Sequence, residues 1–265
     1  MPLPTPQALA RTYRTPGYED PWECVTDYQR VLEYTAEHPD RGSSAVATRL
    51  NLPRSRIRPW MNDSRPDVVR GIQTAEANGW LADHATPDTT TALVALAAWA
   101  LSGGSINHGE GGAHVYFSLD HDDDDYFATL ASTAGFEYHV VNETTSERAT
   151  EARPATDGSV LARVLIAMGV PRTATEKQDT TSLPTFVDTL SAALRLTFAR
   201  VYVLNRGAKH PDKDTLTIRV KRPDAYLDEL VEVLRAASDE PVTRTGKTVT
   251  VSAAAARVLL PAQRL

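Results

Sequence analysis

Charged side chains that could do chemistry gather in two places along this chain. One is a group of aspartates at Asp120 and Asp122–Asp125, and carboxylates of this kind can bind a divalent cation. Acidic residues in the first turn of a helix also interact favourably with the helix dipole while they stay in solvent. Because Asp122–Asp125 open an expected helix that runs to Ala134, we interpret them as a helix start and not as a metal site.

The other reactive residue types form no catalytic or ligand pattern. A lone cysteine, Cys24, excludes an internal disulfide and a multi-cysteine zinc site. The motifs GxxxxGK[ST], GxGxxG and GxSxG do not occur, which argues against nucleotide-phosphate and serine-hydrolase chemistry. The following histidines show no HxH or HxxxH spacing: His108, His114, His121, His139 and His210. We therefore expect no catalytic residue, no metal and no cofactor.

The second charged group is basic and lies between residues 41 and 70, where seven arginines face two acids. A short helix capped by Ser43 or Ser44 and carrying Val46, Ala47 and Leu50 is expected here, followed by a tight turn at Asn51-Leu52. A second helix is expected to start at Pro53. Two helices joined in this way are typical of a helix-turn-helix, whose second helix enters the major groove of DNA. The alternative is an ordinary three- or four-helix bundle with solvated arginines. The candidate DNA contacts in this segment are Arg49, Arg54, Ser55, Arg56 and Arg58.

Composition and periodicity divide the chain into four parts. Residues 1–20 are rich in proline and predict a flexible arm, and residues 21–82 form the helix-turn-helix domain. A small polar linker follows, and then residues 91–170 and 182–262 show the same order of elements: helix, two strands, helix, two strands, helix. The chain is thus expected to have an α+β fold, with an all-α N-terminal domain and a duplicated αββαββα unit.

In the second copy we expect the first helix at Pro184–Phe198, followed by strands at Val201–Arg206 and Thr215–Lys221. The basic loop at 205–210 would join these two strands. Alternation along the second strand puts Leu216, Ile218 and Val220 toward the helices and the residues between them on the open face. The candidate DNA contacts of this copy are Arg206, Lys209, Thr217, Arg219, Lys221, Arg244 and Lys247.

The run Leu96–Ile106, LAAWALSGGSI, resembles a decayed LAGLIDADG motif, and Leu190–Arg200 resembles its counterpart. The connector VLIAMGVPRTATEKQDTTSLPTF is similar to that of single-chain LAGLIDADG homing endonucleases. In that family the two motif helices pack together, and two four-stranded sheets form a saddle over DNA. The small residues that would allow close helix packing are Ala97, Ala98, Ala100, Ala192 and Ala193.

The resemblance also implies what the chain has lost. In the family, an acid near the end of each motif helix holds the metals that activate water. The aligned positions here are Gly103 and Thr197, and neither side chain can replace a carboxylate. We therefore expect a non-catalytic, sequence-specific double-stranded DNA-binding protein, most simply a transcription regulator. The alternatives are an active homing endonuclease with unusual ligands and a scaffold that does not bind DNA.

Charge is distributed unevenly between the parts. Residues 89–180 carry a net charge of −8, residues 181–265 one of +4, and the whole chain one of −6. The acidic first copy could contact a protein partner or a second subunit, and the basic second copy DNA. Fusion of an inactive endonuclease-like unit to a helix-turn-helix is similar to the WhiA regulators, although their order is the opposite.

Composition and the first residues suggest where the protein works. Only 5 of 28 basic residues are Lys, which is typical of a high-GC and halophilic, archaeal-type source. The longest apolar run, Ala92–Leu101, is too short to span a bilayer, and prolines interrupt the start of the chain where a signal peptide would be apolar. We expect no membrane association and a cytoplasmic, nucleoid-associated protein.

Overall fold

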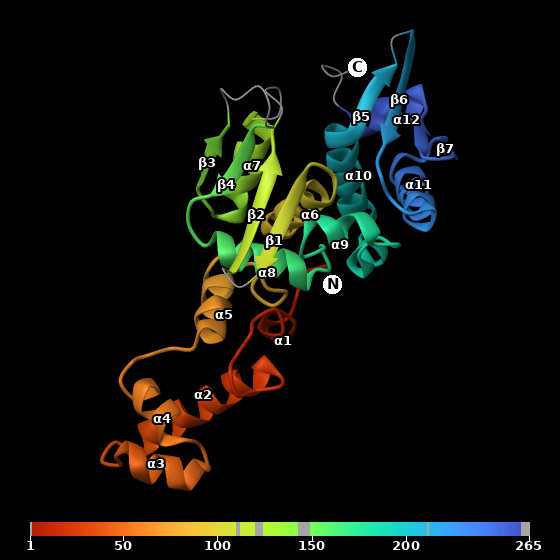
Figure 1. Ribbon diagram of the computed structural model, residues 1–265. Helices are drawn as coiled ribbons and strands as arrows, with labels where there is room; N and C mark the ends of the chain where they lie inside the picture. Colours follow the sequence, from red (N-terminus) through yellow and green to blue (C-terminus); the bar gives the residue numbers. More distant parts are fainter. Residues whose placement is uncertain (1, 110–111, 120–123, 143–148, 211, 261–265) are drawn as a thin grey trace.

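The computed structural model describes residues 2–109, 112–119, 124–142, 149–210 and 212–260, and it has an α+β fold. Residues 2–103 form helices without any strand, and two four-stranded antiparallel sheets follow (Figure 1). The helices of the N-terminal part are α1 (Pro6–Ala10), α2 (Pro21–Glu37), α3 (Ser43–Leu50), α4 (Arg54–Trp60) and α5 (Asp67–Ala77). Apolar residues of α2 to α5 form their common core, in which the rings of Tyr28 and Trp60 meet edge to face at 5.6 Å.

Residues 2–20 are not part of a flexible arm, contrary to the prediction for residues 1–20. The side chain of Thr5 caps α1, and Leu9 is completely buried where α1 packs against α5 and α8. The guanidinium of Arg163 lies 4.1 Å above the ring of Tyr13 and donates a hydrogen bond to the carbonyl of Thr12. A helix of little more than one turn cannot show apolar periodicity, so this packing leaves no recognisable pattern in the sequence.

The same order of elements occurs twice in the rest of the chain. The first set is α6 (Pro87–Ser102), β1 (Gly104–Gly109), β2 (Gly112–Ser118), α7 (Asp124–Ala134), β3 (Tyr138–Val141), β4 (Glu151–Pro154) and α8 (Gly158–Ala167). The second set is α10 (Ala192–Arg206), β5 (Gly207–His210), β6 (Lys213–Arg219), α11 (Asp224–Ser238), β7 (Val242–Thr245), β8 (Thr248–Val251) and α12 (Ala253–Leu259). The strand orders are equivalent, β1-β2-β4-β3 in one sheet and β5-β6-β8-β7 in the other. Between the sets lie α9 (Ala174–Asp179) and a 3-10 helix at Thr185–Thr189.

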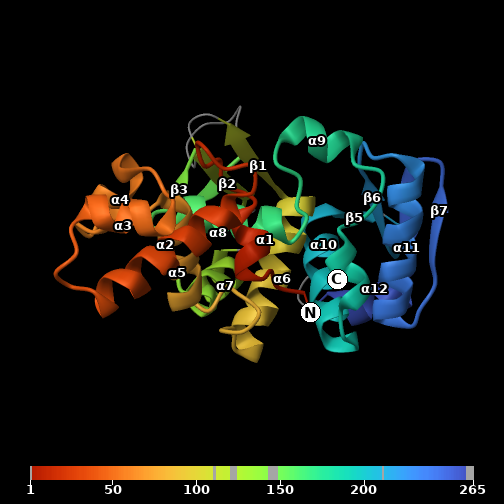
Figure 2. The same cartoon turned by 90° about the horizontal axis from the view of Figure 1, so that it is seen from below.

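Helices α6 and α10 pack against each other between the two sheets (Figures 1 and 2). Every residue of α6 from Ala92 to Ser102 is buried, because α10, α7 and its own sheet surround the helix. The indole nitrogen of Trp99 donates to the carbonyl of Ser118 at 2.9 Å and so fixes α6 to β2. Trp80 follows α5, and its indole nitrogen donates to the carbonyl of Ala134 at 2.6 Å. This hydrogen bond connects the N-terminal helices to α7.

The first helix of the second unit differs from the prediction. Residues 184–198 do not form one helix, since a 3-10 turn ends near Leu190 and α10 begins only after its cap, Ser191. The segment Val201–Arg206, expected to be a strand, is the second half of α10. Its β-branched and aromatic residues favour a strand by propensity, but burial against α6 outweighs that preference. Ala192 and Ala193 are therefore exposed at the start of α10 and do not line a close helix contact.

Two boundaries in the first unit also differ from expectation. Helix α6 starts at Pro87 and not near residue 91, because the side chain of Thr86 caps it and so shortens the linker. Residues 104–109, which carried no strand pattern of their own, form β1 as the partner of β2. The prediction of an α+β chain with a helical N-terminal part is confirmed at this coarse level.

The junction between α6 and β1 makes a testable prediction about stability. A Cβ atom on Gly104 would stand 2.5 Å from the carbonyl oxygen of Tyr116 and 3.1 Å from Cα of Ala100. Both neighbours are backbone atoms, so Gly104→Ala should lower the free energy of unfolding by about 1–3 kcal/mol in chemical denaturation. Gly109→Ala is the matched control, since nothing lies within 4 Å of its Cβ position. Equal stability of the two variants would contradict this account.

Candidate nucleic-acid interface

The turn between α3 and α4 is short and tightly closed. Asn51 ends α3 in the left-handed conformation with a φ of 55°, and the amide of Leu52 donates to the carbonyl of Ala47 at 3.1 Å. Val46 and Ile57 are completely buried across the turn, which fixes the two helices against each other. The side chains that this packing leaves in solvent include four of the expected contacts: Arg49, Arg54, Ser55 and Arg58.

Arg56, the fifth expected contact, does not point outward. Its guanidinium lies 4.2 Å from the centre of the Tyr18 ring, on the N-terminal segment. The Tyr18 hydroxyl donates in turn to Asp27 at 2.9 Å, and burial together with Asp27 raises the pKa of Tyr18. Arg56 stands four residues before the buried Trp60 and therefore shares its inward face of α4. Arg56 is thus a structural residue that joins α4 to the segment before α2.

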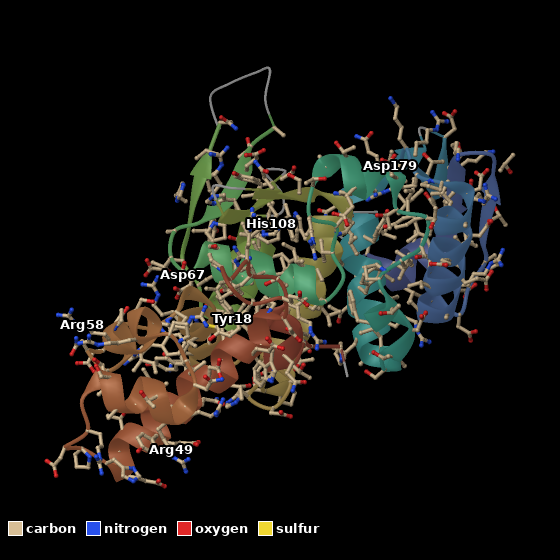
Figure 3. All side chains as sticks on the ribbon, turned by 60° about the horizontal axis from the view of Figure 1, so that its bottom comes forward. Tyr18, Arg49, Arg58, Asp67, His108 and Asp179 are labelled. Carbon is tan, nitrogen blue, oxygen red and sulfur yellow. The ribbon has the colours of Figure 1, made fainter. Side chains whose placement is uncertain are left out.

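The exposed arginines of α3 and α4 differ in their side-chain interactions. Arg54 donates to the hydroxyl of Ser43 at 3.2 Å, whereas Arg49 and Arg58 form no ion pair with any residue that the structure describes. Figure 3 places Arg49 and Arg58 on the outside of the N-terminal helices, away from the two sheets. Each stands in the last turn of its helix, where a cation also meets the negative end of the helix dipole.

The second sheet has an open face that is rich in threonine. Leu216 and Ile218 of β6 are buried against the helices, so the alternate residues face the other way, as predicted. Thr217 is paired with Ala208 of β5 on one side and with Thr250 of β8 on the other. By this alternation and register, the open face carries Lys213, Thr215, Thr217, Arg219, Thr243, Thr245, Thr248 and Thr250. Lys221 follows β6 and is exposed.

Arg244 and Lys247 are not part of this open face. Arg244 of β7 lies opposite the buried Val249 and forms ion pairs with Asp228 at 2.7 Å and Asp224 at 3.1 Å. Lys247 donates to the same Asp224 at 2.9 Å, and the two cations lower the pKa of that carboxyl, Lys247 more than Arg244. Their charges are used to fix β7 and the β7–β8 turn to α11, which the sequence pattern could not reveal.

Arg206 and Lys209 are also displaced from their expected loop. Arg206 belongs to the last turn of α10, and Lys209 lies in the edge strand β5 opposite the buried Leu216. The register therefore places Lys209 on the side of the helices and not on the open face. Of the seven contacts expected from the second copy, Thr217, Arg219 and Lys221 keep the predicted placement.

The first sheet presents fewer cations. His114, Tyr116 and Ser118 lie on its open face, whereas Tyr138 packs on Phe127 on the helix side. The described cation of this face is Arg153, whose guanidinium lies 4.8 Å from the Tyr116 ring centre and forms an ion pair with Glu151 at 2.9 Å.

Cationic side chains gather at the last turn of α6. Its free carbonyls accept hydrogen bonds from three cationic side chains. Lys177 donates to the carbonyl oxygen of Ala100 at 2.8 Å and to that of Gly104, which follows the helix. Arg222 donates to the carbonyl of Leu101 at 3.0 Å, and Arg206 donates to the carbonyl of Ser102 at 2.5 Å. Asn205 of α10 also donates to the Ser102 hydroxyl at 2.8 Å, so this cluster joins the two central helices.

The counterpart of Gly103 in this arrangement is Gly207, because each ends its central helix as the C-cap. The earlier candidate, Thr197, lies in the middle of α10 with its hydroxyl bonded to the carbonyl of Ala193. Neither Gly103 nor Gly207 carries a side chain that could bind a metal.

Electrostatics in the cluster are unusual for lysine. Burial, and then the neighbouring Arg222 and Arg206, lower the pKa of Lys177 to about 7. Two guanidinium groups and an ammonium therefore share a small, partly buried volume at the seam between the two units.

Among the described residues, no group of three His, Cys, Asp or Glu side chains could hold a metal ion. The aspartates at 120, 122 and 123 and the side chain of Asp124 lie outside what the structure describes. No helix in the described part of the chain is long and apolar enough to cross a bilayer. No family model matches the sequence, and no curated protein matches it.

Lys177 makes the stability of the protein depend on pH in a defined direction. Its pKa is about 7 in the folded chain and near 10.5 in the unfolded one. Between pH 7 and about 8.5 the unfolded chain holds more protons at this group, so stability should rise with pH, by at most about 1.4 kcal/mol per pH unit.

Lys177→Met should flatten this rise when the free energy of unfolding is measured by chemical denaturation across that window. Lys213→Met is the control, because Lys213 is exposed on β6. Identical pH slopes in the wild type and in Lys177→Met would rule out the described environment of Lys177.

Proposed function

We propose that the chain is a non-catalytic, sequence-specific double-stranded DNA-binding protein and acts as a transcription regulator. In this proposal the α3–α4 helix-turn-helix reads one groove, and a LAGLIDADG-like saddle without catalytic acids grips DNA. The observation that carries it is the separation of the cations into two kinds. Arg244 and Lys247 are neutralised by acids, whereas Arg49, Arg58, Arg219 and Lys221 form no ion pair with a described residue.

The helix-turn-helix part of the proposal rests on α4. A helix that enters the major groove needs exposed hydrogen-bond donors on a rigid support. Arg54, Ser55 and Arg58 are exposed on α4, while Ile57 and Trp60 hold its other face in the core. Arginine suits this task because its planar donors can bind guanine and phosphate in a bidentate manner.

The saddle part of the proposal rests on the repeated topology and the open face of the second sheet. Two equivalent four-stranded sheets flank a central pair of helices, which is the arrangement that the resemblance to LAGLIDADG proteins implies. Threonine hydroxyls with Arg219 and Lys221 offer donors to phosphates and to base edges. The first sheet lacks comparable free cations among its described residues, so DNA would contact mainly the second unit, and the acidic first unit is available to a protein partner.

Cleavage is the rival function, and the chemistry at the helix ends argues against it. Hydrolysis of a phosphodiester by this class of enzyme needs carboxylates that hold divalent metals. Gly103 and Gly207 stand at the helix ends, and Lys177, Arg206 and Arg222 surround them. Three cations would repel a divalent cation from this position.

Selection of bound fragments from genomic DNA, followed by fluorescence anisotropy on the enriched sequence, tests the proposal. Arg58→Ala should weaken binding about 5- to 100-fold, the range for loss of one arginine–base or arginine–phosphate contact. Arg30→Ala is the matched control, since Arg30 lies in the same domain but pairs with Asp27 at 2.9 Å. A failure to enrich any sequence, or equal affinities of all three proteins, would contradict sequence-specific binding.

The enriched DNA also separates regulator from nuclease. Incubation with Mg²⁺ or Mn²⁺ should leave the fragment intact while binding persists, because the described helix ends offer no carboxylate to hold the metals. Defined cuts that disappear with a chelator would overturn the non-catalytic assignment and favour the endonuclease.

A further inference from the structure

A pocket opens where the connector between the two units crosses the end of the second sheet. It has a volume of about 660 Å³. Its walls come from the end of α9, from the chain after β6 and from the start of β8; Figure 3 labels Asp179 on this side of α9. The lining side chains that matter for the argument are Asp179, Arg219, Lys221, Arg222, Lys247 and Thr248.

Positive charge in the walls of the pocket exceeds negative charge. Four cationic residues line it against one acid, Asp179. Asp224 compensates Lys247, but Arg219 and Lys221 form no ion pair among the described residues. This concentration is notable in a chain whose net charge is −6. An excess of like charges is unfavourable unless an anion or solvent compensates it.

The charge continues behind the pocket and is held rigidly there. Arg222 is only 7% exposed, with its guanidinium 4.7 Å from the ring centre of Tyr226 and one terminal nitrogen on the Leu101 carbonyl. Its other terminal nitrogen is buried and has no hydrogen-bond partner. Through Arg222 the pocket adjoins the cluster at the end of α6, where Arg222 and Arg206 also lower the pKa of Lys177.

The chemistry of the walls selects one class of anion. Arginine and lysine together with a threonine hydroxyl suit a tetrahedral oxyanion, and phosphate is the common biological one. Arg219 lines the pocket and also belongs to the open face of the second sheet, so the two surfaces are continuous. A strand of DNA lying along that face would bring its phosphates to the mouth of the pocket.

We propose that this pocket binds a phosphate group, with Arg219 and Lys221 at its rim and Arg222 as a buried source of positive charge. The expected source is a phosphate of the DNA backbone, and in this respect the inference rests on the proposed function. A small phosphorylated molecule carries the same chemistry and is the other source that an experiment must separate.

The first experiment measures the thermal midpoint of unfolding in inorganic phosphate and in sodium chloride at equal ionic strength. Near-saturating phosphate should raise the wild-type midpoint by about 2–4 °C over chloride. Arg219→Ala/Lys221→Ala should lose most of this shift, and both residues are exposed, so the variant should fold. Arg14→Ala/Arg41→Ala is the control, because both residues are exposed and the variant removes equal charge outside the pocket. No phosphate-specific shift in the wild type, or an equal shift in all three proteins, would overturn the site.

The second experiment identifies the source by the salt dependence of DNA binding. Each neutralised phosphate that is lost should reduce the slope of log K against log [NaCl] by about 1, so the pocket variant should lose about 1 if DNA supplies the single phosphate bound in the pocket. An unchanged slope with a retained phosphate shift assigns the site to a small phosphorylated molecule. A phosphate-specific shift in a protein that binds no DNA would support the phosphate site and contradict the proposed function. DNA binding with no phosphate-specific shift and no change in slope would support the proposed function and contradict the phosphate site.

Discussion

The contact between α6 and α10 is the constraint on which the rest of the structure depends. Both helices end at the same place, and the carbonyl groups of the last turn of α6 need donors there. Arg206 from α10, Arg222 from the chain after β6 and Lys177 from the connector supply them. One helix end thus joins both units and the segment between them, and carboxylates at this position would have to displace or neutralise these cations.

The local elements with strong periodicity could be predicted from the sequence, and those stabilised by tertiary contacts could not. The Asn51-Leu52 turn and the alternation of β6 depend on neighbouring residues, and the structure has both. The sequence of the second half of α10 predicts a strand, because Val201, Tyr202 and Val203 prefer extended backbone. Its helical form depends on burial against α6, which is distant in sequence.

The candidate site was predictable only in part for a related reason. A sequence shows where cations stand but not which acids meet them. Lys221 and Lys247 cannot be distinguished from the sequence alone, yet Asp224 forms an ion pair with Lys247 and not with Lys221. In the same way, Arg56 and Arg58 belong to one basic run, and the helical rotation turns Arg56 onto Tyr18. Which charges remain available to a ligand is a property of the fold.

The joint between the N-terminal helices and the first unit has a mechanical consequence. Trp80 on the carbonyl of Ala134 and Arg163 on Tyr13 fasten the two parts at separate points, which leaves little freedom to swivel. When two binding surfaces belong to one rigid body, the distance between them is fixed. In the proposed complex this distance sets the spacing between the two DNA segments that the protein can contact at the same time. Helical DNA repeats its grooves about every 10.5 base pairs. Changing the spacing between the two DNA segments by a whole turn would therefore weaken simultaneous binding, and changing it by half a turn would abolish it.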